Sequence, residues 1–144
     1  MKVLCALLTL CAVHAAEFRA GAYGAKGDGK TVDTAAIQKA IDAAAAAKAG
    51  AGTVVFAPGV YLSGSLFLKS GTELRVDAGV ELHGAQDLAA YPVMQTRVAG
   101  VEMKWPAALI NVYEQSHVKI SGKGVIDGEG RIWWDKYWDL RKDY

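Results

Sequence analysis

The sequence is poor in cysteine, and the little that it has lies at one end of the chain. Its two cysteines are Cys5 and Cys11. Disulfide bonds stabilise many small secreted domains that cannot build a large core. If residues 1–15 are removed, as argued next, no cysteine is left, and the hydrophobic core alone must hold the fold. A hydrophobic content of 52% in 144 residues is ample for one such domain.

The sequence also lacks an N-terminal apolar run long enough to cross a membrane. The run covers residues 3–13, whereas a membrane-spanning helix needs about 20 residues. Lys2 gives it a basic start, and Val13-His14-Ala15 offers small residues at the positions that a signal peptidase reads. We therefore predict a signal peptide over residues 1–15 and secretion to the periplasm or the cell exterior, without a membrane anchor. The alternatives are an ordinary N-terminal strand or helix, or a lipid-modified Cys11.

An excess of charge of either sign is missing as well. The chain has 16 lysines and arginines against 15 aspartates and glutamates. Loss of Lys2 with the signal peptide would balance the two signs. No basic stripe marks a surface for nucleic acid. We therefore expect a single domain over residues 16–144, with no nucleic-acid partner, in a protein that is monomeric when intact.

Residues 24–31 fit the phosphate-loop pattern G-x-x-x-x-G-K-[ST], but their flanks do not. A phosphate loop follows a buried strand and opens a helix at its Lys-Ser/Thr, so that backbone N–H groups and the helix dipole meet the phosphates. Residues 17–23 contain no apolar run for a central strand, and the helical period begins only at Ile37. Asp33 is therefore the better N-cap, and Lys30 is left facing solvent. The segment is predicted to be a glycine-rich lead-in to a helix.

The hydrophobic pattern changes from a helical to a strand period near residue 50. Residues 33–48 place apolar side chains on one helical face, ended by the glycines at 50 and 52. The face consists of Ile37, Ala40, Ile41 and Ala44. Short strand-like runs follow at 53–56, 60–62, 66–68, 72–76, 80–82, 108–112, 118–120 and 124–128. Because helices do not alternate with these strands, a doubly wound α/β fold is excluded.

A weak internal repeat narrows the all-β choices. Residues 74–84 resemble residues 118–128: in each, an apolar-basic-apolar strand is followed by a small polar turn and a second short strand closed by glycine. The two segments lie 44 residues apart, which suits two turns of a solenoid with coils of about 20–25 residues. A β-sandwich meander is the alternative. The single leading helix favours the solenoid, because a solenoid needs a cap over its first coil.

Several stretches resemble known pectin-degrading enzymes. Residues 18–41 look like the N-terminal signature of right-handed parallel β-helix pectin enzymes. Residues 52–61, 64–70 and 124–130, with the Trp pair at 133–134, resemble glycoside hydrolase family 28, the polygalacturonases. The resemblance implies an all-β, right-handed, single-stranded parallel β-helix with an N-terminal capping helix, of which this chain would supply only the N-terminal coils.

The resemblance to family 28 implies hydrolysis of α-1,4-galacturonan or a related pectic chain, with inversion and without a cofactor. The partner would be a pectic polysaccharide or oligogalacturonide. The family's catalytic motifs, Asn-Thr-Asp, Asp-Asp, Gly-His-Gly and Arg-Ile-Lys, do not occur in this sequence, where Arg131-Ile132 precedes Trp133. We therefore assign no catalytic, cofactor-binding or metal residue. We expect the catalytic coils beyond Tyr144, and this chain alone to be inactive, poorly stable and prone to associate. Two alternatives are a Ca²⁺-dependent pectate lyase and a non-catalytic, tailspike-like carbohydrate-binding β-helix.

Two carboxylates and two histidines are candidates for chemistry. On an extended strand Asp127 and Glu129 would lie roughly 6.6 Å apart on one face. That separation would suit an inverting glycosidase, in which the carboxyl groups are about 6.5–9.5 Å apart. The flanking Gly128 favours instead a turn, with both acids solvated or capping backbone N–H groups. His83 and His117 have no partner at metal-binding spacing and are predicted to be solvated or turn-capping.

Aromatic side chains cluster near the C-terminal end. Trp134, Tyr137 and Trp138 share a helical face, and Trp133 precedes them. Exposed indoles make stacking platforms for sugar rings. The alternative, which the sequence favours, is that the aromatic residues dock a helical insertion onto the β-helix.

Overall fold

The computed structural model describes residues 16–47 and 52–142, and the predicted signal peptide lies outside this range. The strands are β1 (Ala16–Arg19), β2 (Asp28–Val32), β3 (Gly52–Val55), β4 (Gly59–Ser63), β5 (Leu66–Phe67), β6 (Thr72–Arg75), β7 (Val80–Gly84), β8 (Val93–Val98), β9 (Val101–Pro106), β10 (Ile110–Asn111), β11 (Lys119–Ser121) and β12 (Val125–Asp127). The helices are α1 (Thr34–Ala45) and α2 (Arg131–Arg141), with short 3-10 turns η1 (Ala20–Tyr23) and η2 (Leu88–Ala90).

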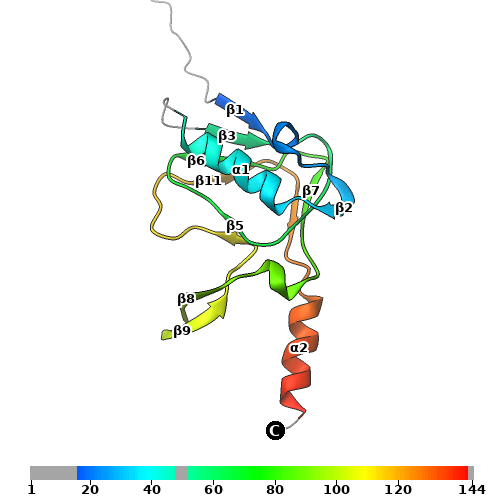
Figure 1. The fold of residues 1–144 in the computed structure, drawn as a ribbon, viewed down its shortest axis with the longest axis vertical. Coiled ribbons are helices and arrows are strands. Elements are labelled where there is room, and N and C mark those ends of the chain that lie inside the picture. The colour runs from blue at the N-terminus through cyan, green and yellow to red at the C-terminus, as the bar shows by residue number, and fades with distance from the viewer. Residues whose placement is uncertain (1–15, 48–51, 143–144) are drawn as a thin grey trace, which may run out of the picture.

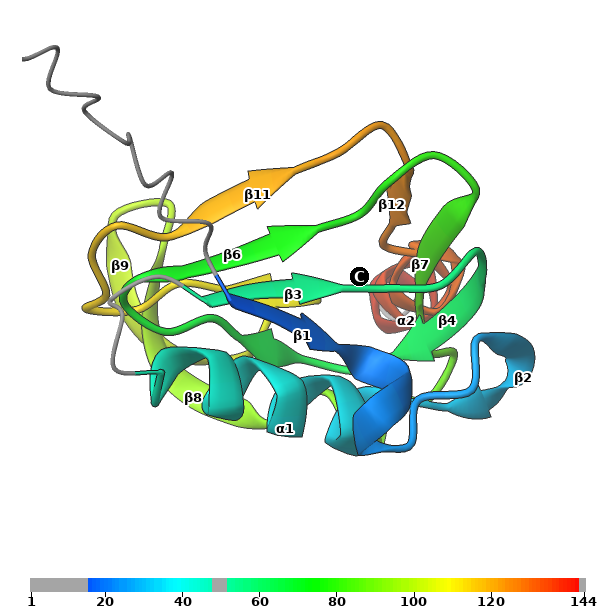
Figure 2. The same ribbon diagram turned by 90° about the horizontal axis from the view of Figure 1, so that it is seen from above.

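The strands form three parallel sheets around one core. The first sheet has the order β1-β3-β6-β11, the second β2-β4-β7-β12, and the third pairs β5 with β10. Each successive coil adds one strand to the first sheet and one to the second, whereas only the two middle coils contribute a strand to the third; Figure 2 shows the four strands of the first sheet side by side. This is the predicted right-handed parallel β-helix, and the β-sandwich alternative is wrong.

Strand alternation explains how the core is built. Val54 and Leu74 are paired neighbours in adjacent coils, and both side chains are fully buried. Tyr61 and Leu82 form the same kind of pair in the second sheet, with 2% and 0% exposure. Because side chains alternate across a strand, every second residue of these strands faces outward. The residues that remain free for function therefore lie on the outer faces of the sheets.

Helix α1 covers the first coil, as the sequence predicts. Its buried face is the predicted one, Ile37, Ala40, Ile41 and Ala44. It contacts β1, β3, β5 and β6, and Figure 2 shows it running beside β1. A Cβ atom on Gly52 would lie 2.5 Å from the backbone oxygen of Ala44, so glycine permits the close approach of α1 and β3. The helix ends at Ala45 rather than at the predicted Lys48. Neither α1 nor α2 has the length and apolar character of a membrane-crossing helix, within the part of the chain that the structure describes.

The 44-residue separation between the two repeat segments corresponds to one coil and not to the two coils that were predicted. Leu74 pairs directly with Ile120, and Leu82 pairs with Ile126, so the two repeat segments are neighbours in the stack. An insertion lengthens the coil between them: the antiparallel hairpin of β8 and β9, which the sequence analysis missed. The hairpin turn at Ala99 and Gly100 has two positive φ angles, 49° and 85°, as in the tight turns that suit β-hairpins. Figure 1 shows this hairpin and α2 both extending away from the stacked coils.

Candidate functional site

The glycine-rich loop at residues 24–31 binds a carboxylate of the chain itself, that of Asp33. The Asp33 carboxylate accepts hydrogen bonds from the backbone N–H groups of Lys26 and Gly27, both at 2.9 Å. Asp33 is only 2% exposed. It occupies the N-cap position of α1 as predicted, but its side chain makes no capping hydrogen bond to the helix. The capping prediction is therefore wrong in its partner: the carboxylate binds the preceding loop.

A second aspartate, Asp28, engages two further amides of this loop. Asp28 accepts hydrogen bonds from the N–H groups of Lys30 and Thr31, at 2.9 and 2.7 Å, and from the Thr31 hydroxyl at 2.8 Å. These hydrogen bonds lower the pKa of Asp28 to about 2. Lys30 is exposed, as predicted. Because four of the loop amides and the threonine hydroxyl already have carboxylate partners within the chain, the segment is not arranged to bind a phosphate.

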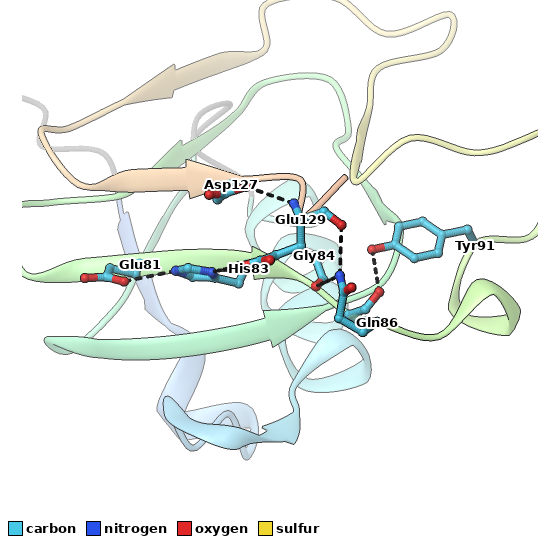
Figure 3. A network of polar contacts seen from close by, with 8 residues as sticks. Glu81, His83, Gly84, Gln86, Tyr91, Asp127 and Glu129 are labelled. Carbon is cyan, nitrogen blue, oxygen red and sulfur yellow. Dashed lines mark hydrogen bonds and ion pairs between the residues drawn. The ribbon is translucent and has the colours of Figure 1, made fainter. Parts of the chain in front are cut away.

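A polar cluster lies on the outer face of the second sheet. His83 on β7 pairs in register with Asp127 on β12. The His83 imidazole lies between two carboxylates, with Nδ1 2.6 Å from Glu129 Oε1 and Nε2 2.9 Å from Glu81 Oε2 (Figure 3). The hydrogen bond with Glu129, and then that with Glu81, raises the pKa of His83, because both stabilise the protonated ring. The prediction of a solvated or turn-capping His83 is wrong. His117 is exposed in the loop between β10 and β11, as predicted.

The turn after β12 places the two candidate carboxylates differently from the extended estimate. Asp127 accepts a hydrogen bond from the backbone N–H of Glu129 at 2.8 Å, which confirms its predicted capping role. Glu129 has a φ of 47°, so the chain bends there and does not continue as a strand. Gln86 supports this bend by donating to the Glu129 carbonyl at 2.9 Å. The Glu129 carboxylate is partly solvated, with 39% of its side chain exposed, but it binds His83 and caps no backbone N–H group among the described residues.

This cluster also offers three metal-ligating atoms. One atom each from His83, Asp127 and Glu129 lie within 4.8 Å of one another. All three side chains hydrogen-bond within the cluster, so their arrangement is already self-consistent without an ion. Sequence spacing could not reveal the group because His83 and Glu129 are joined only by the pairing of β7 with β12.

The histidine cluster predicts a pH dependence of stability. Because the folded-state pKa of His83 is raised above its usual value of about 6.5, its stabilising effect is complete below that value and is lost as pH rises through the folded pKa. We expect His83→Gln to remove this slope and to cost up to about 1 kcal/mol at low pH. Urea unfolding at a series of pH values would measure it. His117→Gln is the matched control, and an equal loss of slope in that variant would contradict the assignment.

The aromatic residues divide between packing and exposure. Trp133 packs edge-on against Tyr91, with ring centroids 5.1 Å apart. Trp134, Tyr137 and Trp138 remain exposed on α2. The docking interpretation is therefore confirmed for Trp133 and wrong for the other three among the described residues. A groove of about 450 Å³ runs between α2 and β9, lined by Trp105, Pro106, Trp133, Trp134, Lys136, Tyr137 and Leu140.

Comparison with known proteins agrees with this architecture. The exo-poly-α-D-galacturonosidase of Dickeya chrysanthemi is 39% identical over 117 residues, which are 75% of this chain and 19% of that protein. Alginate lyase 7 of Azotobacter vinelandii is 47% identical over 72 residues, or 44% of this chain and 8% of that protein. The structure of the Family 28 exopolygalacturonase of Yersinia enterocolitica matches with a TM-score of 0.69 at 35% identity, covering 80% of this chain and 21% of that one.

These matches relate the chain to a part of its relatives. It spans 19% of the length of the Dickeya protein and 21% of the Yersinia protein. The sequence profile described as rhamnogalacturonase A/epimerase, pectate lyase-like, matches residues 19–130, which is more than half of the chain. On this evidence the chain belongs to the rhamnogalacturonase A/epimerase, pectate lyase-like family.

Proposed function

We propose that this chain is part of a glycosidase that cleaves pectic polysaccharide, α-1,4-galacturonan or a related polymer. The observation that carries the proposal is that sequence and fold, over most of the chain, both match proteins that cleave polygalacturonate. The relative with 39% identity is an exo-poly-α-D-galacturonosidase, and the matching structure at 35% identity is a Family 28 exopolygalacturonase. Both matches cover at least three quarters of this chain.

The activity is proposed for the whole protein and not for these coils alone. Among residues 16–47 and 52–142, the strongest carboxylate candidates, Asp127 and Glu129, are held by a backbone N–H group and by His83. We therefore assign no catalytic role to either and expect residues 1–144 alone to hydrolyse nothing. We further propose secretion after cleavage at Ala15, in which case N-terminal sequencing of the exported protein would begin at Ala16.

Analysis of the reaction products tests the proposed chemistry. Polygalacturonate treated with the whole protein should give new reducing ends without unsaturated sugars. NMR of the first products should show the anomeric configuration opposite to that of the substrate, as inversion requires. Ultraviolet-absorbing unsaturated uronides would contradict hydrolysis.

A polysaccharide lyase is the second candidate, because 72 residues of the chain are 47% identical to an alginate lyase. A lyase would cleave the chain by β-elimination, using Ca²⁺ and a basic residue. A hydrolase uses instead a water molecule that a carboxylate activates. The lyase would give one unsaturated end for each cleavage and lose activity on chelation. Binding of polysaccharide without any product would indicate instead a non-catalytic, tailspike-like role.

A further inference from the structure

The groove between β9 and α2 is built by two elements, the β8–β9 hairpin and helix α2, that leave the coil stack on the same side. Figure 1 shows the β8–β9 hairpin and α2 extending together from the stacked coils. Trp105 and Pro106 form one wall, and Trp134, Lys136 and Tyr137 of α2 form the other. A second hollow, lined by Tyr91 and Gly128 as well, shares Trp105, Pro106 and Trp133 with it. The groove therefore continues toward the turn that carries Glu129.

The floor of the groove is fixed while its walls are open. Trp133 rests on Tyr91, and the Tyr91 hydroxyl donates a hydrogen bond to the Ala85 carbonyl at 3.0 Å. By contrast, Trp105 is 50% exposed and Trp134 is 62% exposed. Large aromatic side chains gathered at one exposed place are uncommon unless a partner covers them. Their flat faces suit the apolar C–H faces of sugar rings.

The groove also contains a cation that is not neutralised by a neighbouring side chain. The two acidic residues of α2 have other partners: Asp135 lies 3.9 Å from Arg131, and Asp139 lies 2.6 Å from Lys142. Within residues 16–47 and 52–142, Lys136 forms no ion pair and no side-chain hydrogen bond. It lines the groove between Trp134 and Tyr137. A ligand that combines an apolar face with a carboxylate matches this arrangement.

We propose that the groove between β9 and α2 binds a uronic-acid oligosaccharide, with sugar rings against Trp134 and Trp105 and a carboxylate at Lys136. The choice of a uronide rests on the proposed function. A neutral sugar would match the indoles but would leave Lys136 without a partner. A further protein segment packed into the groove would bury the same lysine beside apolar rings, which is costly for an unpaired charge.

The test measures how tightly the full chain binds an oligogalacturonide and the methyl ester of that oligogalacturonide. Tryptophan fluorescence and calorimetry both report the binding. Trp134→Ala should weaken binding of both ligands roughly tenfold or more, as expected for a central aromatic contact. Lys136→Gln should weaken binding of the acid and leave binding of the ester unchanged. Trp138→Ala is the matched control, because Trp138 is 55% exposed on the same helix but does not line the groove.

Three outcomes would overturn the proposal. The wild-type chain could fail to bind the oligogalacturonide, Trp134→Ala and Trp138→Ala could have equal effects, or Lys136→Gln could affect acid and ester alike. The proposed function is judged separately by the products of the whole protein. If a whole protein carrying Trp134→Ala hydrolyses the polymer and binds the oligogalacturonide with unchanged affinity, the groove proposal is contradicted and the proposed function is not. Groove binding by a whole protein that gives no hydrolysis products would support the groove and contradict the proposed function.

Discussion

Replacing Asp33 with alanine is expected to lower the free energy of unfolding by about 3 kcal/mol or more. The carboxylate is 2% exposed and accepts hydrogen bonds from the N–H groups of Lys26 and Gly27. Its removal leaves two part-buried hydrogen bonds without their acceptor, and an unsatisfied buried group costs about 1–3 kcal/mol. The loop must also stay in place around Gly27, where φ is 61° and a Cβ atom would lie 2.5 Å from the Tyr61 ring.

Asp28 provides the matched control for this prediction. It accepts two backbone hydrogen bonds from the same loop, but it is exposed, so water can replace its carboxylate in Asp28→Ala. That variant should lose clearly less stability than Asp33→Ala. Asp33→Asn should fall between the two, because its amide keeps one acceptor oxygen. Urea unfolding monitored by circular dichroism measures the stability of all three variants. Equal losses of stability in Asp28→Ala and Asp33→Ala would contradict the special role of the buried Asp33 carboxylate.

Replacing Leu74 with alanine should destabilise the coil stack by about 3 kcal/mol, within the range of 2–5 kcal/mol measured for buried leucines. Leu74 lies in the middle of the interior row Val54–Leu74–Ile120, and its side chain is fully buried. The coils on either side are held by their own strands, so they cannot collapse fully into the space that the smaller side chain leaves. The loss therefore combines transfer of the side chain to water with the cost of a cavity.

Ile120→Ala is the control, because Ile120 occupies the next position in the same row but is 48% exposed. Its truncation removes less apolar area from the core and opens no enclosed cavity, so we expect a loss below about 1 kcal/mol. Chemical denaturation of both variants under one set of conditions gives the comparison. A loss at position 120 as large as that at position 74 would mean that β11 is covered in solution, for instance by self-association.

The histidine cluster and the aromatic groove depend on different parts of the architecture. The core positions repeat at short intervals, with Val54 and Leu74 in adjacent coils. The hairpin and α2 interrupt this regularity without disturbing the pairing of β7 with β12. The hairpin and α2 therefore provide the groove walls, while the regular coils supply a rigid base.

The sequence by itself determined the class of fold and most of its elements. The helical face of α1, including Ile37 and Ile41, was predictable because helical periodicity is a local property. The short strands were predictable for the same reason, and the absence of alternating helices excluded a doubly wound sheet. The strands at the edges, such as β2 in the glycine-rich loop, were missed because they bury few side chains and leave little hydrophobic pattern.

Only the tertiary structure decided which distant residues meet. The 44-residue repeat could equally describe one long coil or two short ones, and the hairpin of β8 and β9 makes it one. That choice sets the register of β12 on β7 and brings Glu129 to His83. It is also the tertiary structure that turns the Asp33 carboxylate toward the loop amides, away from the helix. Such contacts depend on coil length and chain reversal, which a local pattern of residues does not contain.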